Sequence, residues 1–217
     1  MTGCSADGDG ADAKPSAGAS QAADAKPSAG ASQAAGGAAR VAESGGRVGG
    51  ADSACELPVT FDVAADWEAE AVDATADGGD GADAELAQEI ADALLHQGPV
   101  TAACEIDAKP AGHIGFLRVW TGEPGAGDAR TVLEDFVAAE DGASGATYRT
   151  FTSGGLDGAE VTYRYMSKLL DETKKERALA VATPGGPVVL HLGGMDSEEH
   201  DAMLPAYELA KRTLRLP

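Results

Sequence analysis

Apolar and polar residues alternate along segment 57–63, LPVTFDV, with the period of a half-buried β-strand. Segment 67–72 follows closely and is predicted to be the hairpin partner of this strand. Residues 73–84 are rich in Asp, Gly and Ala, which predicts a loop. Apolar residues then recur at helical spacing over 86–94, and Gly98 with the proline that follows it is predicted to end this helix.

The central and C-terminal parts of the chain contain six more segments with strand patterns. These are residues 100–106, 114–120, 147–152, 160–168, 177–182 and 188–192. A turn around 109–112, KPAG, joins the first two, and a helix over 128–139 separates the second from the third. In the last strand we expect His191 to lie on the outward face.

A final helix is predicted to begin at Asp196, because Glu199 three residues later completes a capping-box arrangement. Its expected buried stripe consists of Met203, Tyr207, Ala210 and Leu214. The predicted element order is β-β-α-β-β-α-β-β-β-β-α. Short turns between consecutive strands favour antiparallel pairing, so the predicted fold class is α+β, an antiparallel β-sheet flanked by helices.

A perfect internal repeat occupies the N-terminal part of the chain, where residues 12–23, DAKPSAGASQAA, recur unchanged as 24–35. The repeat offers only alanine for burial, which cannot offset the conformational entropy lost on folding. We therefore expect residues 1–50 to be a disordered, low-complexity tether and residues 51–217 to form one domain.

The tripeptide Thr2-Gly3-Cys4 has the form in which the cleavage site of a bacterial lipoprotein ends, so Cys4 is the predicted lipidation site. A secretory signal needs a positive region and an apolar stretch of roughly 7–15 residues, and only three residues precede Cys4. Either translation starts upstream of Met1 or the match is chance. The tether favours the first alternative, and with it an extracytoplasmic protein anchored to the cell membrane by lipid.

If Cys4 carries lipid, Cys55 and Cys104 remain as a pair, and a disulfide between them suits an oxidising compartment. The alternative is two buried, unpaired thiols in a cytoplasmic protein. The formal net charge of −20 repels phosphate backbones and anionic headgroups, which excludes nucleic acid as a partner. No run of 18 apolar residues is present, so any membrane attachment is expected through Cys4 alone.

The strand order, the closing amphipathic helix and the opening FDVAADW at 61–67 resemble the PsbP-like fold. Actinobacterial lipoproteins of the LpqN type are similar in combining a lipobox, a low-complexity tether and one such domain. The resemblance covers residues 55–217 and is weakest at the acidic insertion over 73–98. PsbP-like proteins are commonly accessory or interaction factors, so the resemblance implies binding rather than catalysis.

No motif in the chain predicts an enzyme, a metal site or a cofactor. The acidic residues between 73 and 85 lack the spacing of a calcium-binding EF-hand. His191 and His200 flank acidic residues without the H-E-x-x-H spacing of a zinc helix. The glycine pairs at 154–155 and 193–194 lie outside the contexts that expose a nucleophile or cradle a phosphate.

Segment 104–120 is dense in charged and turn residues between two apolar strands. A hairpin with Phe116 or Trp120 in the core explains it structurally. The functional alternative is a recognition edge that presents five side chains to a protein partner: Glu105, Asp107, Lys109, Arg118 and Trp120.

These features predict a non-enzymatic cell-surface lipoprotein whose domain binds another surface or secreted protein. The alternative is a carrier that holds a small hydrophobic ligand between the sheet and the helices. A large apolar pocket would favour the carrier, and a filled core with an exposed aromatic patch would favour protein binding.

Overall fold

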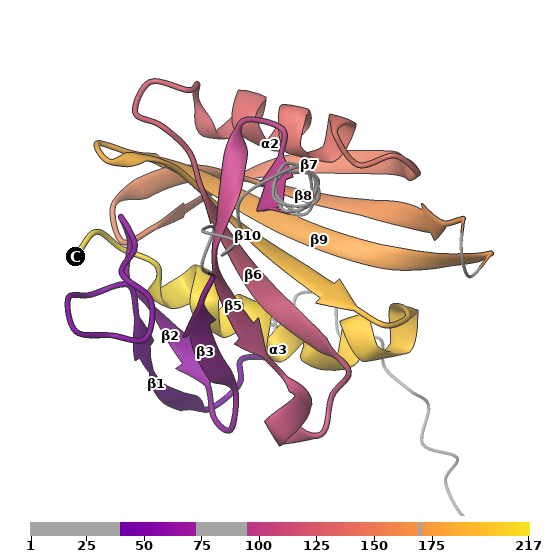
Figure 1. The fold of residues 1–217 in the computed structure, drawn as a ribbon, viewed down its shortest axis with the longest axis horizontal. Helices are drawn as coiled ribbons and strands as arrows, with labels where there is room; N and C mark the ends of the chain where they lie inside the picture. Colours follow the sequence, from indigo (N-terminus) through magenta and orange to yellow (C-terminus); the bar gives the residue numbers. More distant parts are fainter. Residues whose placement is uncertain (1–39, 73–94, 169–170) are drawn as a thin grey trace, which may run out of the picture. The chain divides into compact units, whose positions relative to one another are not determined.

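An antiparallel sheet organises the protein, and its strands follow the order β3-β5-β6-β10-β9-β8-β7, with β4 paired to β5 (Figure 1). The structure, a computed structural model, describes residues 40–72, 95–168 and 171–217. The strands are β3 (Glu68–Ala71), β4 (His96–Gln97), β5 (Val100–Asp107), β6 (Gly115–Thr121), β7 (Ala143–Ser153), β8 (Leu156–Ser167), β9 (Glu172–Thr183) and β10 (Gly186–Gly194). The predicted α+β class is confirmed.

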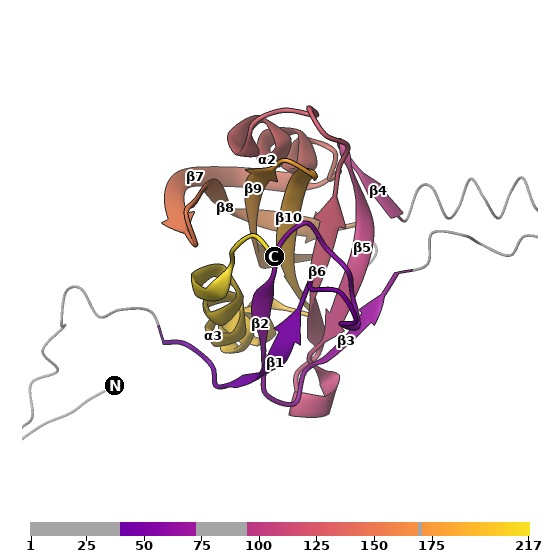
Figure 2. The ribbon, with the colours of Figure 1, turned by 90° about the vertical axis from the view of Figure 1, so that its left-hand side faces the viewer.

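Helices cover opposite faces of this sheet (Figure 2). Helix α3 (Ser197–Thr213) packs on one face and helix α2 (Ala129–Ala138) on the other. Strand β10 lies between them, and all nine of its residues are buried. Its side chains alternate between the two layers, because Leu190 packs in the cluster with α3 while Val189 packs in the cluster with α2.

Both helices begin at an aspartate that caps them. Asp128 accepts hydrogen bonds from the backbone N–H groups at 130 and 131, and Asp196 accepts them from those at 198 and 199. The predicted stripe of α3 is buried throughout. The stripe of α2 includes Val132 and Phe136 as expected, whereas Ala139 is an exposed C-cap residue.

The N-terminal strands differ from the prediction. Strand β1 (Ser44–Val48) pairs with β2 (Phe61–Ala64) in a separate two-stranded sheet beside α3, and β3 pairs with β5 (Figure 2). The predicted hairpin between 57–63 and 67–72 is therefore wrong. Asp66, at a φ of +64°, lies in the turn between β2 and β3, and the chain leaves this turn toward the edge of the large sheet.

The folded part also begins before residue 51, because β1 belongs to it. Segment 44–48, SGGRV, pairs through backbone groups and offers few apolar side chains, so hydrophobic periodicity could not reveal it. Most of the predicted tether (1–39), the predicted loop over 73–84 and the predicted helix over 86–94 lie outside the described residues.

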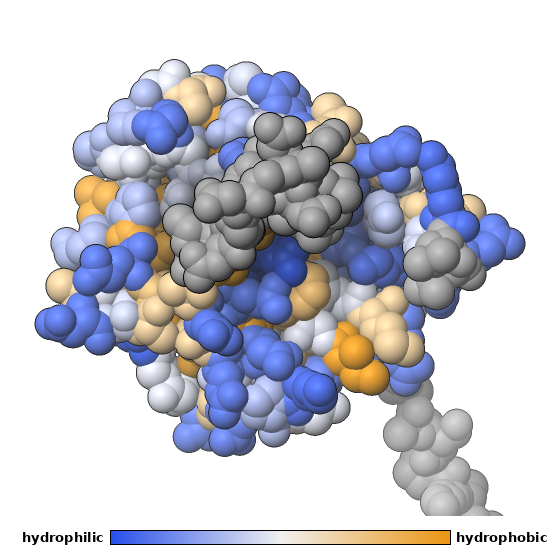
Figure 3. Space-filling view, in the orientation of Figure 1, coloured by the Kyte–Doolittle hydropathy of each residue, from blue (hydrophilic) through white to orange (hydrophobic). Residues whose placement is uncertain are grey.

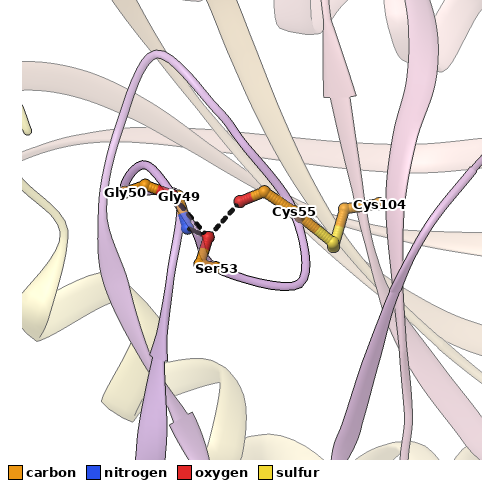
Figure 4. Close-up of a disulfide and its surroundings, with 5 residues drawn as sticks. All are labelled: Gly49, Gly50, Ser53, Cys55 and Cys104. Atoms are coloured by element: carbon orange, nitrogen blue, oxygen red, sulfur yellow. Dashed lines mark hydrogen bonds between the residues drawn. A yellow bond between two sulfur atoms is a disulfide. The ribbon is translucent and has the colours of Figure 1, made fainter.

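A disulfide between Cys55 and Cys104 ties the loop after β1 to the sheet (Figure 4). Both cysteines are buried. The loop itself is held by Ser53, whose Oγ donates to the Cys55 carbonyl oxygen at 2.6 Å and accepts from the Gly49 N–H at 3.1 Å. The bond therefore links two segments that the backbone pairing of the sheet does not join.

We expect replacement of both cysteines, Cys55→Ala with Cys104→Ala, to lower the free energy of unfolding by about 4 kcal/mol. The reason is that the bond closes a loop with a sequence separation of 49 residues in the unfolded chain. Urea unfolding with and without dithiothreitol measures this. Dithiothreitol should destabilise the parent chain and leave the double variant unchanged, and equal sensitivity of the two would contradict the prediction.

Gly186, the first residue of β10 after the β9–β10 turn, is a position where a side chain is poorly tolerated. Its φ is +112°, and an added Cβ would lie 1.9 Å from the Gly122 carbonyl oxygen. We expect Gly186→Ala to lower the free energy of unfolding by about 3 kcal/mol. Gly155→Ala is the matched control, because Gly155 also has a positive φ but open space around it, so about 1 kcal/mol is expected. Equal losses in thermal or urea unfolding would refute the steric argument.

Candidate functional site

Among the residues that the structure describes, helix α2 covers only part of its face of the sheet. It has ten residues, or about 15 Å, whereas the twelve residues of β8 extend for about 40 Å. The residues that follow α2, Ala139 to Asp141, line a pocket with the exposed sheet face beyond them. A second pocket adjoins the first, since Tyr165 and Ser167 line both. We call the two together the sheet-face groove.

The outer part of this groove, which we call the apolar pocket, has a volume of ≈ 670 Å³. Its apolar lining includes Ile114, Phe116 and Met195, and Ile114 and Met195 are 56% and 55% exposed. Figure 3 looks onto this side of the molecule, where orange, hydrophobic atoms gather between the short helix η1 (Lys109–Ala111) and the start of α3. Exposed apolar side chains that gather in a concave surface are typical of binding sites.

The inner part, which we call the polar pocket, has a volume of ≈ 530 Å³. Trp120 and Glu140 line it, together with an ion pair in which Lys168 Nζ lies 2.5 Å from Asp141 Oδ2. Trp120 is 3% exposed, and its ring meets the Phe136 ring edge-on with centroids 5.5 Å apart. Within the described residues, Trp120 Nε1 and Glu140 Oε2 are buried without a hydrogen-bond partner.

Arg118 lies where the two pockets meet on β6. Its guanidinium group stands over the Phe116 ring, 4.4 Å from the centroid, and 5.6 Å from the Trp120 centroid. Its Nε donates to Glu105 Oε2 at 3.0 Å, and the antiparallel register of β5 and β6 places these two residues opposite each other. The β5–β6 hairpin therefore holds the Arg118 guanidinium group close to the Phe116 and Trp120 rings, and the Glu105 carboxylate fixes its position.

The structure thus places the five predicted partner-binding residues in or beside one groove. Asp107 and Lys109 line the apolar pocket, Arg118 and Trp120 line the polar pocket, and Glu105 pairs with Arg118. Trp120 is a core residue, in agreement with the interpretation of segment 104–120 as a hairpin with Phe116 or Trp120 in the core. Sequence reasoning missed the contributions of Tyr165, Lys174 and Met195, which come from three other parts of the chain.

A buried polar cluster lies behind the groove. His191 Nε2 is 3.0 Å from Glu176 Oε2 and 3.2 Å from the Tyr163 hydroxyl oxygen, while Lys174 Nζ lies 2.8 Å from Glu176 Oε1. His191 is 8% exposed, so its predicted place on an outward face is wrong. The reason is that β10 is covered on both faces. The apolar residue Val189, which lies on the same face of the strand as His191, was the sequence feature that could have indicated that this face is also buried.

The environment of this cluster shifts two pKa values. Burial alone raises the pKa of the Glu176 carboxyl, but the hydrogen bond from His191 and the charges of His191 and Lys174 hold that pKa below its ordinary value. Burial, with the negative charges of Glu140 and Glu176, raises the pKa of the Tyr163 hydroxyl well above its ordinary value. Glu176 is therefore held ionised and Tyr163 neutral, an arrangement that locks side chains in place.

A second set of buried charges fastens α3 to the other face. Lys211 Nζ lies 3.1 Å from both Glu160 Oε1 and Glu208 Oε1, and Arg177 Nη1 lies 3.3 Å from Glu208 Oε1. Glu160 is 2% exposed and also pairs with Arg149 at 3.1 Å. Each buried carboxylate has a cationic partner, which a buried charge requires. In the described part of the chain, no group of three or more His, Cys, Asp or Glu side chains is placed to hold a metal ion.

His200 makes the stability of the fold depend on pH. Burial lowers the pKa of its imidazole from 6.5 to about 4. Between these two pH values the His200 imidazole is neutral in the folded protein, whereas it binds a proton in the unfolded chain. Stability from this group is complete above pH 6.5 and falls by up to about 3 kcal/mol as the pH drops toward 4. We expect His200→Gln to remove this decline in chemical unfolding measured from pH 4 to 7. His113→Gln is the control and should retain the decline; a decline of equal size in the His200 variant would contradict the assignment.

Comparisons with known proteins place the chain in a family. A family model described as an uncharacterised lipoprotein matches residues 24–214. No curated protein matches the chain. The solution structure of cyanobacterial PsbP (CyanoP) from Synechocystis sp. PCC 6803 is similar with 13% identity and a TM-score of 0.49, over 87% of this chain and 100% of that one. A likeness at that score supports no conclusion about this chain.

The part of the chain that the structure describes has no helix long and apolar enough to cross a membrane. Cys4, the predicted lipidation site, lies outside the described residues. The family model nevertheless spans the whole folded part up to residue 214, so the match rests on the domain as well as on part of the tether. The chain belongs to this family of uncharacterised lipoproteins.

Proposed function

We propose that this lipoprotein is anchored by lipid on Cys4 outside the cytoplasm and binds another protein through the sheet-face groove. The observation that carries the proposal is the apolar pocket, whose rim residues Ile114 and Met195 are more than half exposed. Exposure of large apolar side chains to water costs free energy, which a partner that covers them removes. We include the finer assignment to the LpqN type in this proposal.

The aromatic and cationic side chains of the groove favour a protein as the partner. Protein interfaces concentrate their binding energy in aromatic residues and arginine, surrounded by polar residues at the rim. Phe116 and Arg118 provide such a pair, and Asp107 and Lys109 stand beside them. The segment predicted as a recognition edge supplies all four.

The charge of the chain favours a basic partner. Its formal net charge is −20, so encounter with a positively charged surface is accelerated and encounter with an acidic one is opposed. The same charge disfavours direct contact of the domain with anionic lipid headgroups. In this proposal the membrane is reached only through the lipid, and the acidic domain is free to meet its partner.

A carrier of a small hydrophobic ligand is the second candidate, because the ≈ 670 Å³ of the apolar pocket lies within the range of about 300–1,000 Å³ that such sites occupy. The carrier alternative placed its ligand between the sheet and the helices, but this interior is packed with fully buried side chains such as Leu190 and Tyr207 beside α3 and Phe136 in α2. A pocket on the surface covers a small apolar ligand less completely than an interior cavity does, which favours the protein partner.

The absence of enzymatic activity is also part of the proposal. His96 lines the polar pocket, and His191, in the polar cluster behind the groove, is buried with its Nε2 against Glu176 and Tyr163. The raised pKa of Tyr163 keeps its hydroxyl protonated, which makes it a poor nucleophile or base. These features support a structural role for the cluster.

We expect a photo-crosslinking side chain at Ile114 in the full chain, displayed on the cells that produce it, to capture one reproducible protein. The same side chain at Leu216, an apolar residue that is 43% exposed and outside both pockets, is the matched control and should not capture it. Met195→Asp should reduce the capture from position 114 by at least about tenfold, because a buried charge opposes the apolar contact.

Two outcomes would count against protein binding. Equal capture from positions 114 and 216 would show that the contact does not involve the groove. Crosslinking of position 114 to a lipid or another small molecule, with no protein adduct, would establish the carrier instead.

A further inference from the structure

Two buried polar atoms in the polar pocket make no hydrogen bond within the described residues, the indole Nε1 of Trp120 and Oε2 of Glu140. One is a donor and the other is an acceptor. A buried polar group without a partner costs free energy, and native proteins leave few of them. Two such atoms on residues that line the same pocket indicate a ligand that supplies both an acceptor and a donor.

The Tyr163 hydroxyl lies close enough to Glu140 for the carboxylate to raise its pKa, but it makes its hydrogen bond with His191 Nε2, at 3.2 Å. The Trp120 ring is 3% exposed and is fixed against Phe136 and beneath Arg118, so its N–H cannot turn toward another acceptor. The two cations that line the pocket already bind other carboxylates, since Arg118 pairs with Glu105 and Lys168 pairs with Asp141.

Glu140 calls for a positively charged donor. Glu140 is half-buried, its Oε2 is inaccessible, and its charge lies close enough to Tyr163 to raise the pKa of that hydroxyl. Hydrogen bonds from an ammonium or guanidinium group to a carboxylate are about twice as strong as neutral ones. An acidic ligand would meet both this carboxylate and the net charge of −20.

We propose that the groove binds an extended segment of the partner protein, whose Lys or Arg side chain donates to Glu140 in the polar pocket. A backbone carbonyl of the same segment accepts from the Trp120 N–H. An apolar side chain of the segment enters the apolar pocket beside Phe116. This inference rests on the proposed function and specifies the chemistry of the partner.

The arrangement of the pockets also sets the spacing of the recognised residues. The pockets adjoin at Tyr165 and Ser167 on the same face of β8. An extended segment points alternate side chains to one side, so residues two apart face the groove together. The recognised pattern is therefore an apolar residue, any residue, and then a basic residue, read in either direction.

The test begins with a displayed library of random eight-residue peptides, selected on the full chain. We expect enrichment of peptides with an apolar and a basic residue two positions apart. A synthetic peptide with the enriched sequence is then compared with the same peptide carrying norleucine in place of its basic residue. Calorimetry measures both affinities against the parent chain and Glu140→Gln.

Glu140→Gln should weaken binding of the basic peptide by at least about tenfold and leave the norleucine peptide unaffected. Glu134→Gln is the matched control, because it removes the same charge from an exposed residue of α2 that pairs with Arg130. It should bind both peptides as the parent does. Equal melting temperatures of the three chains would show that none of these differences reflects unfolding.

The outcomes separate this inference from the proposed function. If Met195→Asp abolishes peptide binding but Glu140→Gln and norleucine change nothing, the basic-side-chain inference is overturned and the groove remains the binding surface. If position 114 crosslinks a protein but no peptide is enriched, the extended segment is overturned. If selected peptides bind Met195→Asp as well as the parent chain, the groove is not the site and the proposed function fails.

Discussion

The structure depends on a strand that is buried on both faces. All nine residues of β10 are buried, so the sheet around it must be covered on two sides, by α3 on one and α2 on the other. Helix α3 has seventeen residues and α2 only ten, and a helix advances less than half as far per residue as a strand. Among the described residues, the part of the α2 face beyond Asp141 therefore has no helix over it, and this part is the sheet-face groove.

Three features hold the sheet in the shape that leaves this groove open. The disulfide at Cys55 fastens the small sheet of β1 and β2 to β5. The charges around Glu160 fasten α3, and those around Glu176 brace the floor of the groove. Buried ion pairs of this kind add little net stability compared with apolar packing, but loss of one partner is costly, so they favour a single arrangement. A rigid floor lowers the entropy that binding must overcome.

Much of the fold could be predicted from the sequence, because apolar and polar residues alternate with a clear period wherever one face of a helix or strand is buried. The stripe of α3 and the strands around 100–106 and 114–120 are examples. Strand β1 could not be predicted, since glycine pairs through its backbone alone. The partner-binding set was found in part, because β5 and β6 are neighbours in sequence, so their register brings Glu105 to Arg118. Tyr165, Lys174 and Met195 could not be found, because only the tertiary pairing of β8, β9 and β10 brings them to the groove.

The central claim is that the partner binds in the sheet-face groove, beyond the C-terminal end of α2. Methionine methyl NMR of the full chain tests it most directly, when the chain is titrated with the protein that crosslinking from position 114 identifies. Met195 lies in the apolar pocket, whereas Met166 is 41% exposed and lines neither pocket, and Met203 is a buried residue of α3. The account predicts that the Met195 methyl signal shifts and gains contacts to partner protons while the Met166 signal stays in place. A shift at Met166 with Met195 unchanged would contradict it.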